Sequence, residues 1–185
     1  MIPQKYKWLE TIGTLPKIVQ IALKDLGVKE IKGSANNPRI MQMAKNIGVD
    51  KIYTSDDKLA WCALAVNSWI FESGKPLVDF KKDRYNLLRA RYLLNWGNPV
   101  PNNEFKLGDV VIIERGGAGH CFVALAKTPN GNPIGIGGNQ SDMVRIDEFD
   151  KKRILGVRNL YSIAPPASVK DYIVSSEGKL STNEA

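Results

Sequence analysis

The stretch that decides the fold is DDKLAWCALAVNSWIFESGKP, residues 56–76. Its interior is almost continuously apolar, and Gly74 supplies a stop near its end. A helix that is apolar on nearly all sides is usually the central, buried one of a domain. Ser55, Asp56 and Asp57 are the candidates to cap its start, because short polar side chains accept hydrogen bonds from the first turn.

Other helices are expected on both sides of this segment. Apolar residues recur at spacings of three and four over residues 15–26, which predicts one amphipathic helix. In a second helix, Asn37 can cap the start, Pro38 suits the first turn and Gly48 ends it. A further helix is expected over residues 83–94, before a stretch rich in prolines.

The pattern then changes to short runs rich in β-branched residues and separated by turns. These runs cover residues 109–114, 120–127, 133–138, 143–146 and 155–163. Asn130-Gly131 is typical of a tight hairpin turn. Helices first and hairpin-linked strands second predict an α+β domain with an antiparallel sheet. We expect one domain over residues 1–164 and a polar C-terminal tail over residues 165–185.

Composition narrows the choice of function. The chain has 185 residues, a net charge of +7, two cysteines and one histidine. Its length suits one compact domain, and two cysteines cannot form a disulfide framework. One histidine and two cysteines leave few ligands for a usual zinc site. The start has no apolar segment of a secretory signal peptide and no stretch is long enough to span a bilayer, so we expect synthesis in the cytoplasm and no stable membrane insertion.

The basic charge favours a polyanionic partner, which includes nucleic acid, an acidic membrane surface and an anionic cell-wall polymer. The lysines and arginines are scattered, however, and the chain carries no helix-turn-helix, zinc-finger or RNA-binding motif. We therefore expect no nucleic-acid partner.

Cys62 and His120 are the candidates for nucleophile and base. Cys62 lies near the start of the central helix, where the helix dipole and free N–H groups favour a thiolate. His120 follows a glycine-rich turn and opens a strand. Each residue alone is more often structural, but together they form the layout that a Cys–His nucleophilic pair needs.

A third side chain usually holds such a histidine in the required tautomer. Asn139 is the first choice, with Gln140 and Asp142 as alternatives, because all three follow the next strand. Strand alternation would place Asn139 and Gln140 on opposite faces, so the two could not both serve. Cys121 would point away from His120, and we interpret it as a core residue.

The chain resembles papain-like peptidoglycan hydrolases, in particular the CHAP amidase/peptidase group, the related NlpC-type peptidases and a subgroup common in phage endolysins. The likeness covers residues 15–161 in six ordered pieces: ALKDLGVKEIKGSANNPRI, DDKLAWCALAVN, KLGDVVII, GHCFVAL, GIGGNQ and GVR. It implies a papain-like cysteine hydrolase fold, with N-terminal helices packed on a C-terminal antiparallel β-sheet. By the same likeness, Cys62 matches the nucleophile, His120 the base and Asn139 the residue that orients the histidine.

The resemblance implies an amidase or endopeptidase that acts on peptidoglycan. We expect it to act as a monomer, without cofactor or metal, and, lacking a signal peptide, to reach the wall after a holin, lysis or a secretion machine releases it. Trp61, Tyr53 and Gln140 are the candidates to line the substrate cleft. Two alternatives remain open: a non-catalytic wall-binding or assembly module on this scaffold, and a Cys-dependent acyl transferase or deamidase.

Two features depart from the family pattern. Many CHAP enzymes carry an acidic residue two positions before the asparagine, where this chain has Gly137. Papain-like enzymes often use a glutamine before the nucleophile to bind the oxyanion, and the matching stretch here is Ser55-Asp56-Asp57. An ionised carboxylate cannot donate a hydrogen bond, so the second oxyanion donor is not identified.

Overall fold

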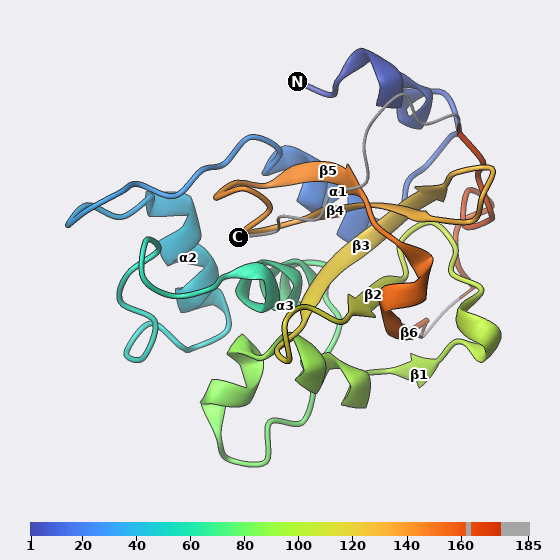
Figure 1. Cartoon of the computed structure of the whole chain (residues 1–185). Helices are drawn as coiled ribbons and strands as arrows, with labels where there is room; N and C mark the ends of the chain where they lie inside the picture. The colour runs from blue at the N-terminus through green and yellow to red at the C-terminus, as the bar shows by residue number, and fades with distance from the viewer. Residues whose placement is uncertain (162–163, 175–185) are drawn as a thin grey trace.

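The computed structural model describes residues 1–161 and 164–174 and has helices packed against an antiparallel sheet (Figure 1). The predicted α+β class, with helices before the sheet, is confirmed. The helices are α1 (Lys17–Lys24), α2 (Pro38–Asn46) and α3 (Cys62–Glu72), and the 3₁₀ helices are η1 (Gln4–Glu10), η2 (Arg84–Leu88), η3 (Ala90–Asn95), η4 (Pro101–Asn103) and η5 (Lys151–Arg153). The strands are β1 (Asn98–Pro99), β2 (Val110–Ile113), β3 (His120–Lys127), β4 (Pro133–Gly137), β5 (Arg145–Glu148) and β6 (Ile154–Asn159).

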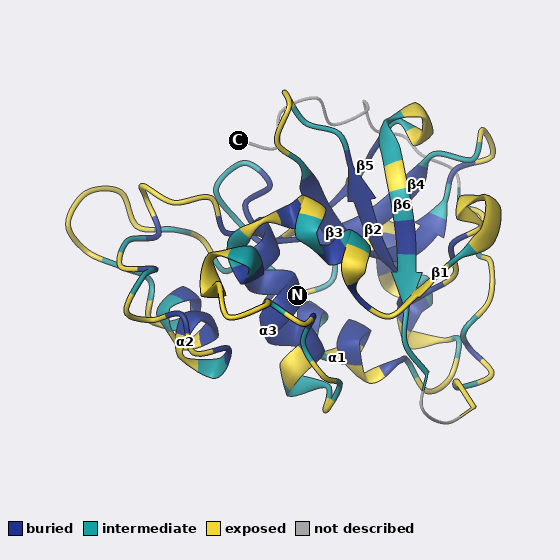
Figure 2. Cartoon of the chain, turned by 90° about the horizontal axis from the view of Figure 1, so that it is seen from below, coloured by how far each residue is buried: buried dark blue, intermediate teal, exposed yellow. Residues whose placement is uncertain are grey.

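Strand β3 lies inside the sheet, whose order is β1-β6-β2-β3-β4-β5 with antiparallel neighbours throughout. Successive side chains of a strand point to opposite faces. Cys121 and Val123 accordingly join the core beneath α1 and α3, whereas Phe122 packs with Phe149 in a smaller cluster on the other face. Both faces of β3 are therefore covered, as its dark colour in Figure 2 shows.

Helix α3 is the central helix that its sequence predicts. Its residues from Cys62 to Ile70 are all buried, and it packs against α1, α2 and β3. It begins at Cys62, however, and the two aspartates before it do not cap it. Asp56 Oδ2 accepts a hydrogen bond from Asn37 N at 2.7 Å, and Asp57 Oδ2 accepts one from Gly33 N at 3.2 Å. These carboxylates brace the loop before α2 instead.

The earlier helices match their predictions, but the expected helix over residues 83–94 does not form as one piece. Asn37 caps α2 by accepting a hydrogen bond from Arg39 N at 2.8 Å. In the 83–94 stretch, Arg89 adopts extended backbone angles (φ −103°, ψ 113°), which divide the segment into η2 and η3. The break arises because an extended residue cannot continue the helical hydrogen-bond ladder.

The contacts of the domain extend past the expected boundary at residue 164. Lys127 N donates to Tyr172 O at 2.8 Å, and Val174 N donates to Lys127 O at 2.9 Å. Ser168 is buried and donates to Thr14 O. Residues 165–174 therefore pack on the domain rather than leaving it, and the rest of the predicted tail lies outside the described residues.

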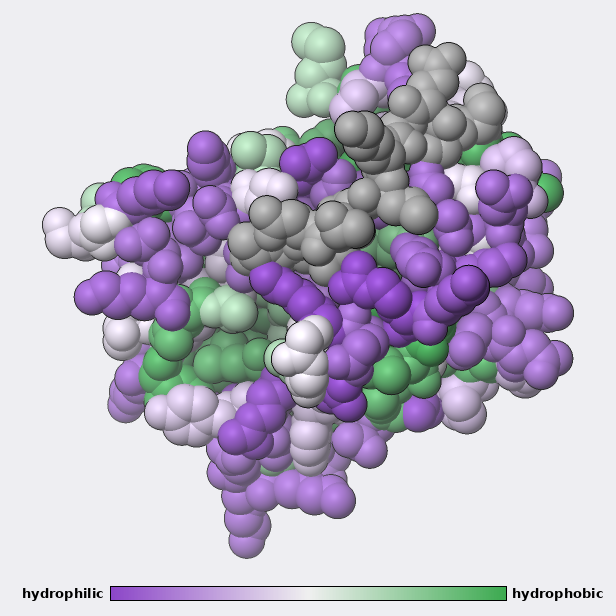
Figure 3. Space-filling model, viewed as in Figure 1, coloured by the Kyte–Doolittle hydropathy of each residue, from purple (hydrophilic) through white to green (hydrophobic). Residues whose placement is uncertain are grey.

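The surface seen in Figure 3 is mostly hydrophilic, with small apolar patches. None of the helices in the described part of the chain combines the length and the apolar character that crossing a membrane requires.

A buried carboxylate joins the three α-helices. Asp25, at the end of α1, accepts hydrogen bonds from Trp69 Nε1 of α3 and from Arg39 Nε and Nη2 of α2, each at 2.7 Å. Arg39 also pairs with Glu72 at 2.8 Å. Because Asp25 is only 5% exposed, its removal would leave two donors without their acceptor.

We predict that Asp25→Ala lowers the free energy of unfolding by about 3 kcal/mol, as expected for breaking a buried charged network. Denaturant unfolding measures this change. Arg89→Ala is the control, because it removes an exposed ion pair with Asp83 and should cost about 0.5 kcal/mol or less. Equal effects of the two substitutions would contradict a structural role for Asp25.

Candidate active site

Cys62 is the first residue of α3, and its environment favours the thiolate. Trp61 at the N-cap position supplies no side-chain hydrogen bond, so the N–H groups of the first turn keep their capacity to bind an anion. The backbone N–H of Ala63 contributes to lowering the pKa of the Cys62 thiol. The side chain is buried, with the residue 4% exposed.

His120 opens β3 and is fully buried, in largely aromatic surroundings. Its ring centroid lies 5.6 Å from that of Phe149 and 6.2 Å from that of Phe122. The imidazole Nε2 lies 3.1 Å from Gln140 Oε1. Gln140 thus holds one ring nitrogen, while two phenyl rings restrict how the imidazole can turn.

The orientation of the Gln140 amide determines the tautomer of His120. Gln140 Nε2 lies 2.9 Å from the carboxylate of Asp147 and 2.9 Å from the carbonyl oxygen of Arg145. Both neighbours are acceptors, so the amide nitrogen must face them and Oε1 must face the imidazole. An amide oxygen accepts only, so His120 Nε2 carries the proton and Nδ1 keeps a lone pair.

Asp147 anchors this arrangement from β5. It is buried, which raises the pKa of its carboxyl group, while pairing with Arg145 at 2.9 Å acts in the opposite direction. Asp147 was not among the site residues expected from the sequence. Its place inside the strand segment RIDE was the one sequence signal that could have pointed to it. An acid that is buried within a strand is uncommon and usually has a donor partner.

The bond to Gln140 leaves the other ring nitrogen of His120, Nδ1, open. Nδ1 is buried and has no hydrogen-bond partner of standard geometry within the described residues. The Cys62 side chain lies beside this imidazole and beside the Cys121 thiol. Contact with Cys121, then with His120 and the Ala63 N–H, holds the pKa of Cys62 well below its usual value despite the opposing effect of burial. The arrangement supplies an easily ionised thiol next to a base.

Gln140, and not Asn139, is the side chain that contacts His120. Strand β4 ends at Gly137, so the alternation of a strand does not continue to these two residues. Asn139 has a left-handed backbone (φ 56°), and after this turn the Gln140 side chain contacts His120 and Asp147. The expectation that Asn139 orients His120 is therefore wrong, because Gln140 makes that contact. The expectation that Gln140 lines the substrate cleft is also wrong, because its side chain is fully buried.

The two glycines before Asn139 make room for these contacts. A Cβ at Gly137 would overlap Gln140 Oε1, and a Cβ at Gly138 would come within 2.7 Å of the Trp61 ring. Gly137 occupies the position where many members of the resembled family carry an acidic side chain. Here that space is taken by the glutamine that reaches His120.

Trp61 and Tyr53 do not line a cleft, contrary to expectation. Both are fully buried, and each has its polar atom engaged inside the protein. Trp61 Nε1 donates to Glu30 Oε2 at 3.1 Å, and Tyr53 OH donates to Leu59 O at 3.1 Å. They are packing residues that support the start of α3.

A polar cavity of about 230 Å³ lies next to the Cys62 segment. Its lining consists of Glu30, Asp56, Asp57, Lys58, Leu59, Ala60, Arg115, Asn139 and Asp142. Ala60 is two residues before the thiol, and Asn139 adjoins the glutamine that holds His120. Four carboxylates against two cationic side chains make this cavity acidic in a basic protein. The loop before α3, a predicted place for specificity contacts, contributes to it.

The fold is similar to that of the peptidoglycan hydrolase RipB from Mycobacterium tuberculosis, with a TM-score of 0.48, 19% sequence identity, and coverage of 88% of this chain and 70% of that one. No protein-family model matches the chain. No curated protein matches it by sequence.

We predict that Gln140→Ala impairs the thiolate, whereas Asn139→Ala does not. Because the pKa of Cys62 is lowered, we expect it to react with iodoacetamide at pH values where an ordinary thiol, with a pKa of about 8.5, is protonated. Without Gln140 the imidazole loses its orientation, so the inflection of alkylation rate against pH should move upward toward the ordinary value.

Cys62→Ala, which leaves Cys121 as the remaining thiol, shows how much alkylation comes from elsewhere. An upward shift in Asn139→Ala together with an unchanged profile in Gln140→Ala would contradict the assignment.

Proposed function

We propose that this chain is a cysteine amidase or endopeptidase that hydrolyses an amide bond in bacterial peptidoglycan. The observation that carries the proposal is the placement of the Cys62 thiol at a helix N-terminus, beside a buried imidazole held by Gln140. A nucleophile with a lowered pKa next to an oriented base is the requirement for covalent acyl chemistry.

Each group has a definite part in the proposed reaction. The Cys62 proton passes to His120 Nδ1, and the thiolate sulfur attacks the carbonyl carbon of the amide. Free N–H groups at the start of α3 stabilise the oxyanion that forms. His120 then protonates the departing nitrogen, and the C–N bond breaks to leave a thioester on Cys62. Water, deprotonated by His120, hydrolyses this thioester and releases the acid.

Peptidoglycan as the substrate rests on sequence and charge. The six ordered pieces that resemble CHAP and NlpC-type hydrolases include both Cys62 and His120, and on them we also propose the endolysin-like subgroup. A net charge of +7 favours an anionic wall polymer. The cavity between Ala60 and Asn139 is the proposed place for the peptide beside the scissile bond.

Cys62→Ala and His120→Ala should each lower the rate of solubilising purified peptidoglycan at least about a hundredfold, because each removes a group that moves the proton or forms the bond. His120 is the single histidine, so no other imidazole can replace it. Cys121→Ser, which keeps a small donor in the core, should retain most of the activity. Turnover by Cys62→Ala at the wild-type rate would contradict the mechanism.

Mass spectrometry of the products identifies the bond and the reaction. An amidase releases whole stem peptides from the glycan, whereas an endopeptidase releases shortened stems or opened cross-links. Peptides joined to an added amine would indicate acyl transfer, and loss of side-chain ammonia without cleavage would indicate deamidation. Binding to the wall with no released product would favour the non-catalytic module.

A further inference from the structure

Asn139 is a buried polar side chain that has no part in the proton transfers of the proposed reaction. The residue is 6% exposed, yet its carboxamide forms no hydrogen bond within residues 1–161 and 164–174. Its amide atoms are also not among the described side-chain atoms that are both closed off from solvent and without a partner. The amide therefore keeps a small exposed surface. Most buried polar groups in proteins have a partner, because burying one without a partner costs free energy.

The exposed part of Asn139 meets the polar cavity of about 230 Å³ beside the Cys62 segment, since this residue is one of those that line it. Ala60, two residues before Cys62, lines the same cavity. The residue before Asn139 is packed on α3, because a Cβ on Gly138 would come within 2.6 Å of the Ala65 Cβ. Asn139 is thus held beside the start of the helix that carries the proposed nucleophile.

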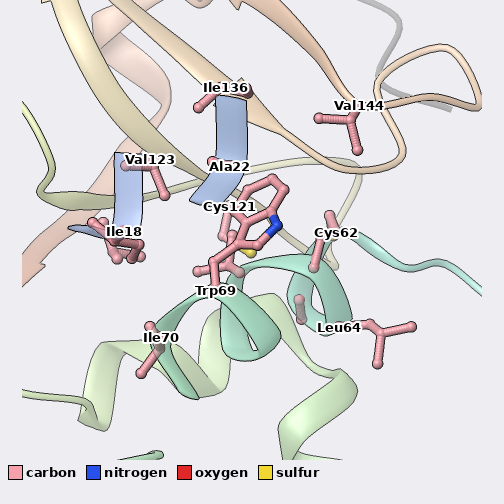
Figure 4. Packing of buried hydrophobic residues seen from close by; sticks show 14 of the residues in the cluster. Ile18, Ala22, Cys62, Leu64, Trp69, Ile70, Cys121, Val123, Ile136 and Val144 are labelled. Atoms are coloured by element: carbon pink, nitrogen blue, oxygen red, sulfur yellow. The ribbon is translucent and has the colours of Figure 1, made fainter. Parts of the chain in front are cut away.

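The residue after Asn139 reaches the proposed base. Gln140 Oε1 lies 3.1 Å from His120 Nε2. In Figure 4, Cys62 at the first turn of α3 and Val144, at the end of the connection that contains Asn139, lie on the same side of the packed core. A ligand in the cavity that contacts Asn139 would therefore lie next to both members of the proposed catalytic pair.

We propose that Asn139 is a substrate-binding residue whose side-chain amide holds the peptide of the substrate in this cavity. The inference rests on the proposed function and deepens it, because it names a residue that binds the peptide beside the scissile bond. An amide side chain has an acceptor oxygen and two donor hydrogens, and a peptide unit has one acceptor and one donor. Asn139 can therefore pair with both polar atoms of a peptide unit.

No other side chain of this cavity can make the same pair of hydrogen bonds. Asn139 is the neutral polar side chain among the residues that line it. The remaining polar side chains are charged, and each can either accept or donate in its ionised form, but not both. They are Glu30, Asp56, Asp57, Lys58, Arg115 and Asp142. Loss of the Asn139 amide would thus remove a contact that its neighbours cannot replace.

The backbone of Asn139 offers a rival explanation for the presence of asparagine. Its φ of 56° is left-handed, a conformation that asparagine tolerates better than most residues. Asparagine could therefore serve only the turn. Glycine adopts this φ without steric cost and has no side chain, so Asn139→Gly removes the amide and keeps the turn. This substitution separates the two explanations, which Asn139→Ala does not, because alanine would strain the backbone there.

The test measures how the protein binds muropeptides that a muramidase releases from purified peptidoglycan. Calorimetry uses proteins that also carry Cys62→Ala, so that turnover does not disturb the binding signal. Asn139→Gly should weaken muropeptide binding roughly five- to tenfold, as expected for the loss of one or two hydrogen bonds. In proteins that keep Cys62, the same substitution should raise the KM for muropeptides by a similar factor and change kcat little.

Two further variants complete the set. Asn139→Asp keeps the size and the acceptor but loses both donors, so it should weaken binding as well, and it supplies the answer if the glycine variant is poorly folded. Asn102→Gly is the matched control, because Asn102 also has a left-handed backbone (φ 54°) but is exposed and lines a different cavity. This control should leave both the affinity and the KM unchanged.

The outcomes distinguish substrate binding from a role in the turn. Wild-type affinity and KM in Asn139→Gly would overturn the inference, since asparagine would then serve the turn alone. A lower kcat with unchanged KM would also overturn it, because the amide would act in the transition state and not in binding. No muropeptide binding by the Cys62→Ala protein would overturn it as well. Weaker binding in Asn139→Gly, without any hydrolysis of purified walls by the wild type, would count against the proposed function and not against the role of Asn139.

Discussion

The hydrogen bond between His120 Nε2 and Gln140 Oε1 is the interaction on which the proposed chemistry depends. It assigns the proton to Nε2 and leaves Nδ1, which has no hydrogen-bond partner in the described part of the chain, as the nitrogen that can act as the base. The glutamine could not do this if its amide were free to turn over. Asp147 and the Arg145 carbonyl prevent the turn, because both accept hydrogen bonds from the amide nitrogen. The two acceptors that hold the Gln140 amide nitrogen thus determine which nitrogen of His120 can act as the base.

The scaffold keeps this unit in place relative to α3. Gly138 lets the end of β4 approach Trp61 and Ala65 closely, so the turn that carries Gln140 is packed on the start of the helix that carries Cys62. The helix itself is buried along most of its length and is joined to α1 and α2 through Asp25. Cys62 and His120 therefore lie on different elements, α3 and β3, but the close packing of these elements keeps the two side chains together.

Much of this could be predicted from the sequence because periodicity and turn chemistry are local properties. The apolar run after Trp61 predicted the central helix, Asn37-Pro38 predicted the start of α2, and short β-branched runs predicted the sheet. The pairing of Cys62 with His120 followed from their positions at the start of a helix and a strand. By contrast, the divided segment around Arg89 depends on one extended residue that no local pattern revealed.

Asn139 was the first choice for the third residue and Gln140 an alternative, and the first choice failed for a physical reason. Alternation along a strand applies only while the strand lasts, and β4 ends two residues before Asn139. The left-handed backbone of Asn139 redirects the chain, a conformation that asparagine tolerates but that its presence alone does not establish. Cys121 was correctly expected in the core. Its contact with Cys62 depends on how closely α3 packs on β3, which is a tertiary property.

The most direct test of the central claim is the tautomer of His120, read from nitrogen-15 NMR of the imidazole. His120 is the single histidine, so one ring gives all the signals. The spectrum is recorded at about pH 8 on a Cys62→Ser variant, so that no thiolate lies beside the ring. The account predicts a protonated Nε2 and an unprotonated Nδ1. A proton on Nδ1, or an equal mixture of the two tautomers, would contradict it.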